Sequence, residues 1–503
     1  MSVRTILWIG LALAFRTWLC PSAYAEESRP LSLAQAIERA LGGNADLRRE
    51  RVAVAKAAAN LTAAEGQFDV RLESNVWVKR QTTPALAECA APACIDLAAG
   101  TTTAAAFGLG VSRNLETGGS LKLSGLATRT SSVLPPGSDL LGATYHDSSL
   151  ALTFTHPLLR GFGTEIAQAN LRKARIQQDI TQLRRQMRAC NVLRDVVIAY
   201  WELAYATQDL TIKHSAVELA REQLRTTQAM ITAGRLAEAD RASVERAIAQ
   251  RLEDLATAEQ SLYFRSLDLQ RLFGVAPDPR APLLAAADAP PTGSPPLDDA
   301  AEVKRALAAN PQLRSLRLGL GLSALDLVTA RNTLRPRLDV TGSVGPVGRR
   351  TGLGDSLKQT AGFGDLAWSA GLSFELPAQK RAARGQMRAA EEDLDLARID
   401  AQDFELQVRD LVLRATSGIR TTSKRVELGR QEVEFARLNL DAERARFQAG
   451  RATNNDVLLR QQELKDAETR LLRATVDQNA TEATLAAVTA EVLERYGVVL
   501  AGP

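Results

Sequence analysis

The arrangement of hydrophobic and polar residues predicts two very long helices. Between Gly163 and Gly234 the chain contains neither Gly nor Pro, and residues 165–231 fit one uninterrupted helix. A second long run, free of Pro, covers residues 381–448. At 1.5 Å per residue, each helix would be about 100 Å long. A compact domain does not need helices of this length, so the pattern indicates a function in which the protein spans a long distance.

Other stretches alternate with a period of two, which is the pattern of β-strands. In residues 71–79, for example, Leu72, Val76 and Val78 alternate with polar side chains. The pattern predicts four strands in the first half and two in the second, at 71–79, 107–112, 120–128, 149–156, 338–344 and 368–376. Residues 116–119 would form a tight turn, whereas long loops are expected at 80–103, 131–146 and 345–364.

The second half of the chain repeats the order of the first. Each half reads as a short helix, strands, a long helix, a tight turn and a further short helix. The halves are expected at 26–275 and 298–503, joined by a Pro-rich connector at 276–297. Their strands would fall within about 68–156 and 335–376, and shorter helices are expected at 31–65, 238–272 and 454–495. Asn44 has a counterpart 266 residues later in Asn310, and both follow an Arg-Ala-Leu sequence.

Both long helices are followed by the same short sequence. Each ends at Ala-Gly-Arg, with an aspartate six residues after the glycine; these residues are Ala233, Gly234, Arg235 and Asp240 in the first half and Ala449, Gly450, Arg451 and Asp456 in the second. Glycine at such a turn supplies a backbone conformation that other residues resist. The aspartates are either first-turn acids favoured by the helix dipole or charged groups with a role of their own at the turn.

The N-terminus predicts an export signal. Arg4 precedes an apolar run at residues 6–15, and Ala23-Tyr24-Ala25 fits a cleavage site after Ala25, so residues 1–25 would be the signal peptide. A membrane anchor is the alternative, but the ten apolar residues are fewer than the roughly 17 that a spanning helix needs. Leu19, directly before Cys20, is too large for a lipid-attachment signal.

Cysteine spacing predicts one disulfide. Cys89 and Cys94 lie five residues apart in a loop-like segment, and an exported protein meets an oxidising compartment. A metal pair is the alternative, but no histidine lies in that loop. Cys190 lies among apolar residues of the first long helix and is interpreted as an inert buried thiol.

Composition narrows the classes of function. The chain has 503 residues, a net charge of +4 and 24% charged residues, and this near balance argues against a nucleic-acid partner. His146, His156 and His214 have no nucleophile or acid spaced as in a triad or zinc site. We therefore expect no catalytic residue, no metal ligand and no cofactor.

The predicted strands require a partner. Six strands leave two edges, whose backbone groups would stay unsatisfied in a bilayer. Long loops on one rim and a tight turn on the other are typical of outer-membrane barrels. The helices are rich in Ala, Arg, Glu and Gln and show no broad apolar face able to close a bundle core, which suits side-by-side packing around a wet lumen. We therefore expect several copies to build one barrel; a soluble β-sandwich is the alternative.

The duplicated order and the two Ala-Gly-Arg turns resemble the TolC-type outer-membrane efflux proteins, or outer membrane factors, over essentially the whole mature chain. The resemblance implies an α+β membrane protein with a duplicated helix–strands–long helix–helix repeat that forms a trimeric outer-membrane β-barrel plus a periplasmic α-helical tunnel. It implies a homotrimer in outer-membrane lipid that works with a periplasmic adaptor protein and an inner-membrane RND, MFS or ABC transporter. The function implied is the exit duct of a tripartite efflux pump or type I secretion system.

Some residues match motifs of that family. Residues 447–451 resemble its aromatic-x-small-Gly turn, so both turns would form the periplasmic entrance and the adaptor tips. Asp456 matches the first of two acids that ring the entrance in some members, but Leu459 stands at the second position. The sequence therefore does not decide whether a selectivity ring forms. The first half also has two strands more than the best-known members. Either a trimer has about eighteen strands, or residues 107–128 form a hairpin outside the barrel.

Two other classes of protein would show different sequence patterns, and the sequence does not identify the cargo. A periplasmic adaptor-like structural linker would carry one helical hairpin without a twofold repeat, and a passive porin would lack the long helices. Drugs, metabolites, metal ions and secreted proteins all remain open as cargo. Four Met and three His residues make a copper or silver relay less favourable, because such a path would need soft ligands.

Overall fold

The computed structural model describes residues 29–84, 86–90, 93–97, 100–133, 144–278, 282–293 and 296–499. The expected signal peptide, residues 1–25, lies outside these ranges. The chain divides into two units. The sheet unit contains residues 45–192 and 297–416 and the chain from residue 485 onward, and the helical unit contains the chain up to residue 44 with residues 193–296 and 417–484.

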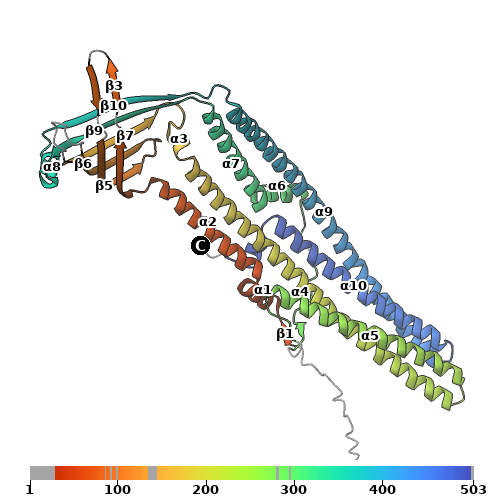
Figure 1. Cartoon of the computed structure of the whole chain (residues 1–503). Helices are drawn as coiled ribbons and strands as arrows, with labels where there is room; N and C mark the ends of the chain where they lie inside the picture. The colour runs from red at the N-terminus through yellow and green to blue at the C-terminus, as the bar shows by residue number, and fades with distance from the viewer. Residues whose placement is uncertain are drawn as a thin grey trace, which may run out of the picture. The chain divides into compact units, whose positions relative to one another are not determined.

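The sheet unit is built on a six-stranded antiparallel sheet (Figure 1). The strand order is β10-β9-β7-β6-β5-β2, with β2(Arg71–Thr83), β5(Gly100–Asn114), β6(Ser120–Val133), β7(Thr144–Pro157), β9(Arg337–Arg350) and β10(Leu366–Glu375). These are the four strands of the first half and the two of the second that the alternating pattern predicts. Because β5 and β6 lie inside this sheet, the alternative in which residues 107–128 form a separate hairpin is wrong.

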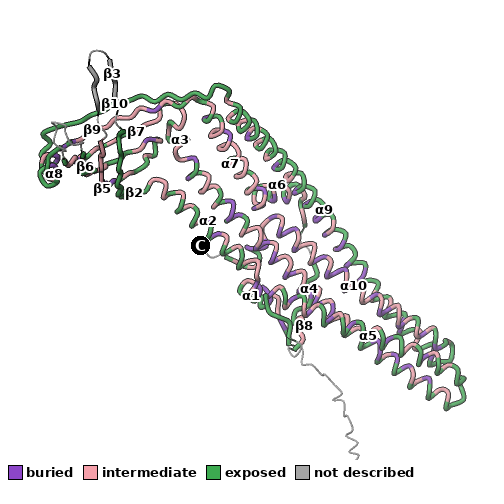
Figure 2. Tube along the Cα trace, viewed as in Figure 1, coloured by how far each residue is buried: buried purple, intermediate pink, exposed green. Residues whose placement is uncertain are grey.

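The sheet has one apolar and one polar face, because side chains alternate along each strand and neighbouring strands are in register. Opposed apolar pairs continue across it from β2 to β10: Val76 with Phe107, Val111 with Leu123, Leu123 with Leu152, Leu152 with Val344, and Val344 with Trp368. On the other face, Lys122 donates to Glu73 over 3.1 Å. The edge strands β2 and β10 are exposed along their whole length (Figure 2).

Two of the expected loops contain regular structure. Residues 80–103 include a small hairpin, β3(Leu86–Ala90) and β4(Ala93–Leu97), in which the backbones of Cys89 and Cys94 are directly opposed. The side chains of both cysteines lie outside the described part of the structure, so their disulfide stays a prediction. In the expected loop 345–364, β9 continues to Arg350 and a helix follows, α8(Leu353–Ala361). A plain loop at 345–364 was therefore wrong.

The expected first helix, 31–65, is also wrong as a single element. The chain forms a short strand β1(Arg29–Leu31), then α1(Leu33–Gly43) and α2(Ala45–Glu65), followed by η1(Gly66–Phe68). Asn44 breaks the helix with extended backbone (ψ 127°), and Asn310 does the same between α6(Asp299–Ala309) and α7(Pro311–Thr333) with ψ 118°. Each asparagine uses its side-chain amide elsewhere: Asn44 donates to Leu272 O over 2.9 Å, and Asn310 to Val488 O over 3.0 Å.

The long helices have nearly the expected bounds. Gln168 separates α3(Thr164–Ala167) from α4(Ala169–Thr232), so the first begins with a break that the pattern did not indicate. α5(Glu238–Leu272) and α9(Arg381–Gln448) coincide with the expected ranges. The expected helix 454–495 is divided into α10(Asn454–Val488) and α11(Val492–Arg495), because Ala490 adopts a left-handed φ of 60°.

The connector contributes to the helical unit. Its β8(Leu284–Ala286) pairs in parallel with β1. Strands of three residues are too short to be predicted from an alternating pattern in the sequence. Tyr200 of α4, fully buried, donates its hydroxyl to Asp288 over 2.7 Å, and Asp288 also accepts from Leu33 N over 2.8 Å. Burial raises the pKa of Tyr200, so this hydroxyl stays a donor. Tyr200 Oη also lies 3.0 Å from Leu31 O, so this tyrosine links the start of the described chain to the connector.

The long helices of the helical unit all bury apolar side chains, and buried positions recur along these helices (Figure 2). Residues at most 2% exposed come from all four long segments: Leu193, Val196, Val197, Leu203, Val244, Leu269, Ile419, Leu440, Val457 and Val476. The expectation that no apolar face could close a bundle core is therefore wrong for this unit. Cys190, 2% exposed in the neighbouring part of α4, is a free buried thiol whose pKa burial raises to about 11. Among the described helices, none combines the length and hydropathy needed to cross a membrane.

Candidate functional site at the hairpin tips

Each long helix reverses at a glycine, and the two reversals have the same geometry. Gly234 has φ 71° and donates to Ile231 O over 2.8 Å, while Arg235 N donates to Met230 O over 2.9 Å. Gly450 has φ 70° and donates to Phe447 O over 2.9 Å, while Arg451 N donates to Arg446 O over 2.8 Å. This is the Schellman pattern, which satisfies the last carbonyls of a helix. The repeated Ala-Gly-Arg sequence therefore encodes one type of turn twice.

Both aspartates behind the turns cap the helices that return from them. Asp240 accepts from Ala237 N over 3.1 Å at the start of α5. Asp456 accepts from the Thr453 backbone N over 2.9 Å and from the Thr453 hydroxyl over 2.7 Å, and its own N–H faces that hydroxyl at 3.3 Å. These contacts form a capping box. The Thr453 hydrogen bonds lower the pKa of Asp456, so it is ionised at the helix N-terminus.

The two tips are joined by a buried cluster. Phe447, 3% exposed, and Val457, fully buried, pack with Leu440 and Leu464, and Met230 and Leu236 of the first tip lie against them. A polar contact reinforces this packing. Asn454 Oδ1 accepts from Gln223 Nε2 over 2.6 Å and from the Thr227 hydroxyl over 2.9 Å.

Asn454 is the central group of that contact. It is 3% exposed, and Gln223 and Thr227 are 7% and 0% exposed. Within the described residues, its Nδ2 atom has no hydrogen-bond partner. A buried amide that is only half satisfied costs free energy, so this polar contact adds less to the apolar packing of the two hairpins than its two hydrogen bonds alone would.

Farther along the helices, α10 carries charged groups against both helices of the first hairpin. Arg473 donates to Glu202 of α4 over 2.8 and 3.1 Å, which raises the pKa of the guanidinium. Lys465 Nζ lies 2.9 Å from Asp254 of α5. Arg251, 5% exposed, donates to Gln461 over 2.9 Å, and burial lowers its pKa.

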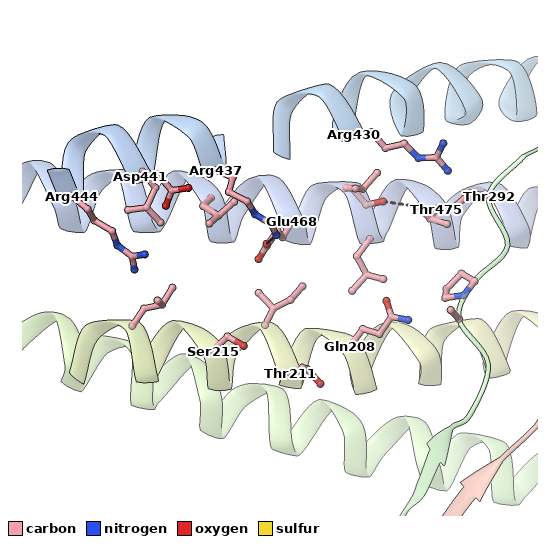
Figure 3. A pocket seen from close by; sticks show the side chains of 18 residues that line it. Gln208, Thr211, Ser215, Thr292, Arg430, Arg437, Asp441, Arg444, Glu468 and Thr475 are labelled. Atoms are coloured by element: carbon pink, nitrogen blue, oxygen red, sulfur yellow. Dashed lines mark hydrogen bonds and ion pairs between the residues drawn. The ribbon is translucent and has the colours of Figure 1, made fainter. Parts of the chain in front are cut away.

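A cavity of about 730 Å³ opens among α4, α9, α10 and the connector (Figure 3). Three arginines at seven-residue spacing line its α9 wall, and Arg437 is paired with Glu468 over 3.4 Å. Gln208, Thr211 and Ser215 line the α4 side, while several leucines form the apolar part of the wall. Asp441 and Glu468 line the cavity as well, so its wall combines three cations, two carboxylates and apolar side chains. In the described part of the chain, no group of three or more His, Cys, Asp or Glu is placed to hold a metal.

Comparison with known families decides the class of the protein. The sequence model of the outer membrane efflux protein family matches residues 120–275 and 303–491. The chain belongs to the outer membrane efflux protein family. The match begins at the first residue of β6, so α1, α2 and the strands β2 to β5 lie outside it. A search of curated protein sequences found no match.

Solved structures with the same fold include several outer-membrane channels. The outer-membrane channel OprN is 18% identical, with a TM-score of 0.67 over 91% of this chain and 89% of that one. VceC of Vibrio cholerae is 15% identical, with a TM-score of 0.63 over 91% and 96% of the two chains. MtrE of Neisseria gonorrhoeae is also 15% identical, with a TM-score of 0.62 over 91% and 88%.

This outer membrane efflux protein therefore resides in the outer membrane, with its helical part in the periplasm, as the resemblance implied. Its family consists of channels, not of enzymes. Membership argues against the alternative of a periplasmic adaptor-like linker and against a passive porin without long helices.

The tip residues named from the sequence fall into two groups. Ala233, Gly234 and Arg235 lie at the same kind of turn as Ala449, Gly450 and Arg451, and Asp240 and Asp456 lie in the first turns of the return helices. Leu459, at the position of the second acid, is 48% exposed. Sequence reasoning missed the Gln223–Thr227–Asn454 contact, because the Thr-Asn-Asn-Asp stretch at 453–456 does not show which polar side chain is buried.

Proposed function

We propose that this efflux protein forms a homotrimeric channel-tunnel that serves as the exit duct of a tripartite efflux pump or a type I secretion system. The sheets of three copies close one β-barrel, and their helices form the tunnel. A periplasmic adaptor binds the hairpin tips, and an inner-membrane RND, MFS or ABC transporter supplies cargo and energy.

The observation that carries this proposal is the open sheet. β2 and β10, the two edges, have 13 and 10 residues, and each pairs with one neighbour only among the described strands. Both carry large exposed apolar side chains, Val76 at 72% and Trp368 at 75% among them. Edges of this length and hydrophobicity cannot stay unpaired in a bilayer. Pairing β2 of one copy with β10 of the next closes the sheet, and three copies give about eighteen strands.

A second surface of the chain also needs a copy of itself. Along α9, Ile399, Leu406 and Leu413 recur every seven residues and are 60%, 66% and 49% exposed. Leu428 and Phe435, again seven apart, are 51% and 62% exposed. A heptad stripe of this kind is buried when it packs against another helix. In the proposed trimer, the partner is a helix of the neighbouring copy.

The proposed adaptor surface rests on charge and chemistry at the tips. Gly234, Arg235, Gly450 and Arg451 are exposed, and two arginines beside accessible turns suit a partner with carboxylates. The arginine-lined cavity offers similar chemistry. Asp456 is engaged by Thr453, so a role as a cation-attracting ring would come in addition to its capping role.

The test combines oligomeric state with conductance. The purified protein is expected to migrate as a trimer in detergent and to form pores in planar bilayers. Leu406→Glu places a charge in the α9 stripe and is expected to weaken the trimer at unchanged helix content. Gln407→Lys, at an exposed neighbour off the stripe, also adds a charge, keeps a donor for Asp403 (2.6 Å from the Gln407 amide) and should leave the trimer intact. A monomeric protein that forms no pores would refute the proposal.

A further inference from the structure

The short helix α8 packs against β7 and β9 near one end of the sheet (Figure 1). Ser148 of β7 is directly opposed to Gly348 of β9. Because side chains alternate along a strand, both residues share the face of Leu150, Leu152 and Val344. A Cβ atom added to Gly348 would come within 2.4 Å of Ser356 O, so only glycine leaves room for α8 there.

Hydroxyl groups hold this helix against the sheet. Ser148 Oγ lies 2.7 Å from Ser356 Oγ and 2.6 Å from Thr360 Oγ1, and Ser356 also donates to Gly348 O over 3.0 Å. The three side chains are 3%, 0% and 8% exposed. The side of α8 that faces the protein is therefore polar, which is the reverse of a helix packed on the core of a water-soluble protein.

The apolar side chains of α8 point elsewhere. Leu353 and Leu357, one turn apart, are 44% and 48% exposed. Phe363, just after the helix, is 63% exposed and has a φ of 52°, a conformation that strains a residue with a side chain. The segment thus exposes two leucines and a phenylalanine with a strained backbone, and exposed apolar groups of this kind mark a contact site.

We propose that α8 is an interfacial helix whose Leu353, Leu357 and Phe363 insert into the outer-leaflet lipid of the outer membrane. The inference rests on the proposed barrel, in which the apolar face of the sheet contacts lipid. Ser148 precedes Leu150 by two residues on that face, so α8 lies at the rim of the apolar band. Exposed Lys358 of α8 and Arg350 at the end of β9 match the phosphate groups of anionic lipids. At nine residues α8 lies along the interface instead of crossing the bilayer.

Spin labels test the position of α8 in the full-length protein. Cys89, Cys94 and Cys190 are replaced, and one cysteine at a time is introduced by Leu357→Cys, Leu353→Cys, Asp355→Cys or Leu152→Cys. The labelled protein is reconstituted in liposomes that contain lipopolysaccharide. Collision rates are then measured with oxygen, which partitions into lipid, and with a water-soluble nickel chelate. Asp355 is the matched control on α8, and Leu152 reports on the face of the sheet.

Labels at Leu357 and Leu353 are expected to collide severalfold more with oxygen than with nickel, as the label at Leu152 does, whereas the label at Asp355 shows the reverse. Equal nickel access at Leu357 and Asp355 would overturn the inference alone, because α8 would then face water. Low access to both reagents at Leu357 and Leu353 would also overturn it, since protein would cover the helix. Nickel access at Leu152 would overturn the barrel and the inference together.

Discussion

The contact between the two hairpin tips makes a quantitative prediction. Asn454→Ala removes the acceptor of two hydrogen bonds, those from Gln223 over 2.6 Å and from Thr227 over 2.9 Å. The two losses are unequal, because the Thr227 hydroxyl also lies 2.8 Å from Gln223 O and keeps that acceptor. The Gln223 amide, 7% exposed, loses the acceptor that Asn454 provides.

Leaving a buried donor unpaired costs about 1–3 kcal/mol. Asn454 Nδ2 has no partner among the described residues, so its removal relieves part of that cost. We therefore expect Asn454→Ala to lower the local free energy of tip opening by about 2 kcal/mol, which corresponds to roughly thirtyfold faster opening-limited exchange. Asn454→Asp keeps an acceptor for both donors at the N-terminus of α10, so its effect should be smaller.

Hydrogen exchange read by mass spectrometry measures this effect in peptides that cover residues 223–230 and 454–460. Asn455→Ala is the matched control, since Asn455 is exposed and adjacent, and it should stay within about 0.5 kcal/mol of the parent protein. If Asn454→Ala and Asn455→Ala exchange at the same rate, the buried contact does not hold the tips together and the reasoning is refuted.

Three further predictions concern the tips and the loop. Gly450→Ala should destabilise the second turn by about 1 kcal/mol in thermal unfolding. The cause is the φ of 70° alone, because no atom lies within 4 Å of the added methyl group. A matching loss is expected for Gly234→Ala, and Gly450→Asn should cost less. The pKa of Asp456 is lowered in the folded protein, so its cap is complete above the unfolded pKa near 3.8 and is lost only as the pH falls through the lower folded pKa. Hydrogen exchange at residues 453–457 should therefore show no loss of the cap between pH 8 and 5. Asp456→Ala should accelerate that exchange. Alkylation and mass spectrometry of the unfolded, unreduced protein should find one reactive thiol, Cys190; labelling of Cys89 and Cys94 as well would contradict the predicted disulfide.

The sequence predicted the elements whose pattern is local and missed those that depend on tertiary contacts. A stretch without Gly or Pro was sufficient for α5 and a long stretch without Pro for α9, and strict alternation identified all six strands of the sheet. The breaks at Gln168 and Ala490 went unseen, because both residues tolerate a helix and only the fold interrupts it there. The sequence did not predict α8, because its contact with the sheet is made by serine and threonine, which are usually interpreted as loop residues.

The candidate site divides in the same way. The Ala-Gly-Arg turns could be found because a left-handed turn needs glycine at one position, and that requirement is visible in the sequence. Asn454 could not be found, because its neighbours Thr453, Asn455 and Asp456 are equally plausible polar groups, and burial alone distinguishes it. The apolar core of the helical unit was missed because its helices also carry many charged residues, which lower the contrast between faces.

The two asparagines that break the first helix of each half support the predicted duplication at the level of single atoms. Leu272 and Val488, whose carbonyls accept from Asn44 and Asn310, are the last residues of α5 and α10. In each half, therefore, the amide at the start donates to one of the last carbonyls of the closing helix, which lack a partner within that helix, across 228 and 178 positions of the chain. Such a contact ties a half to itself and leaves its strands free to pair with others. A repeat closed in this way can donate strands to a sheet shared with the second half, and by the same logic to one shared with further copies of the chain.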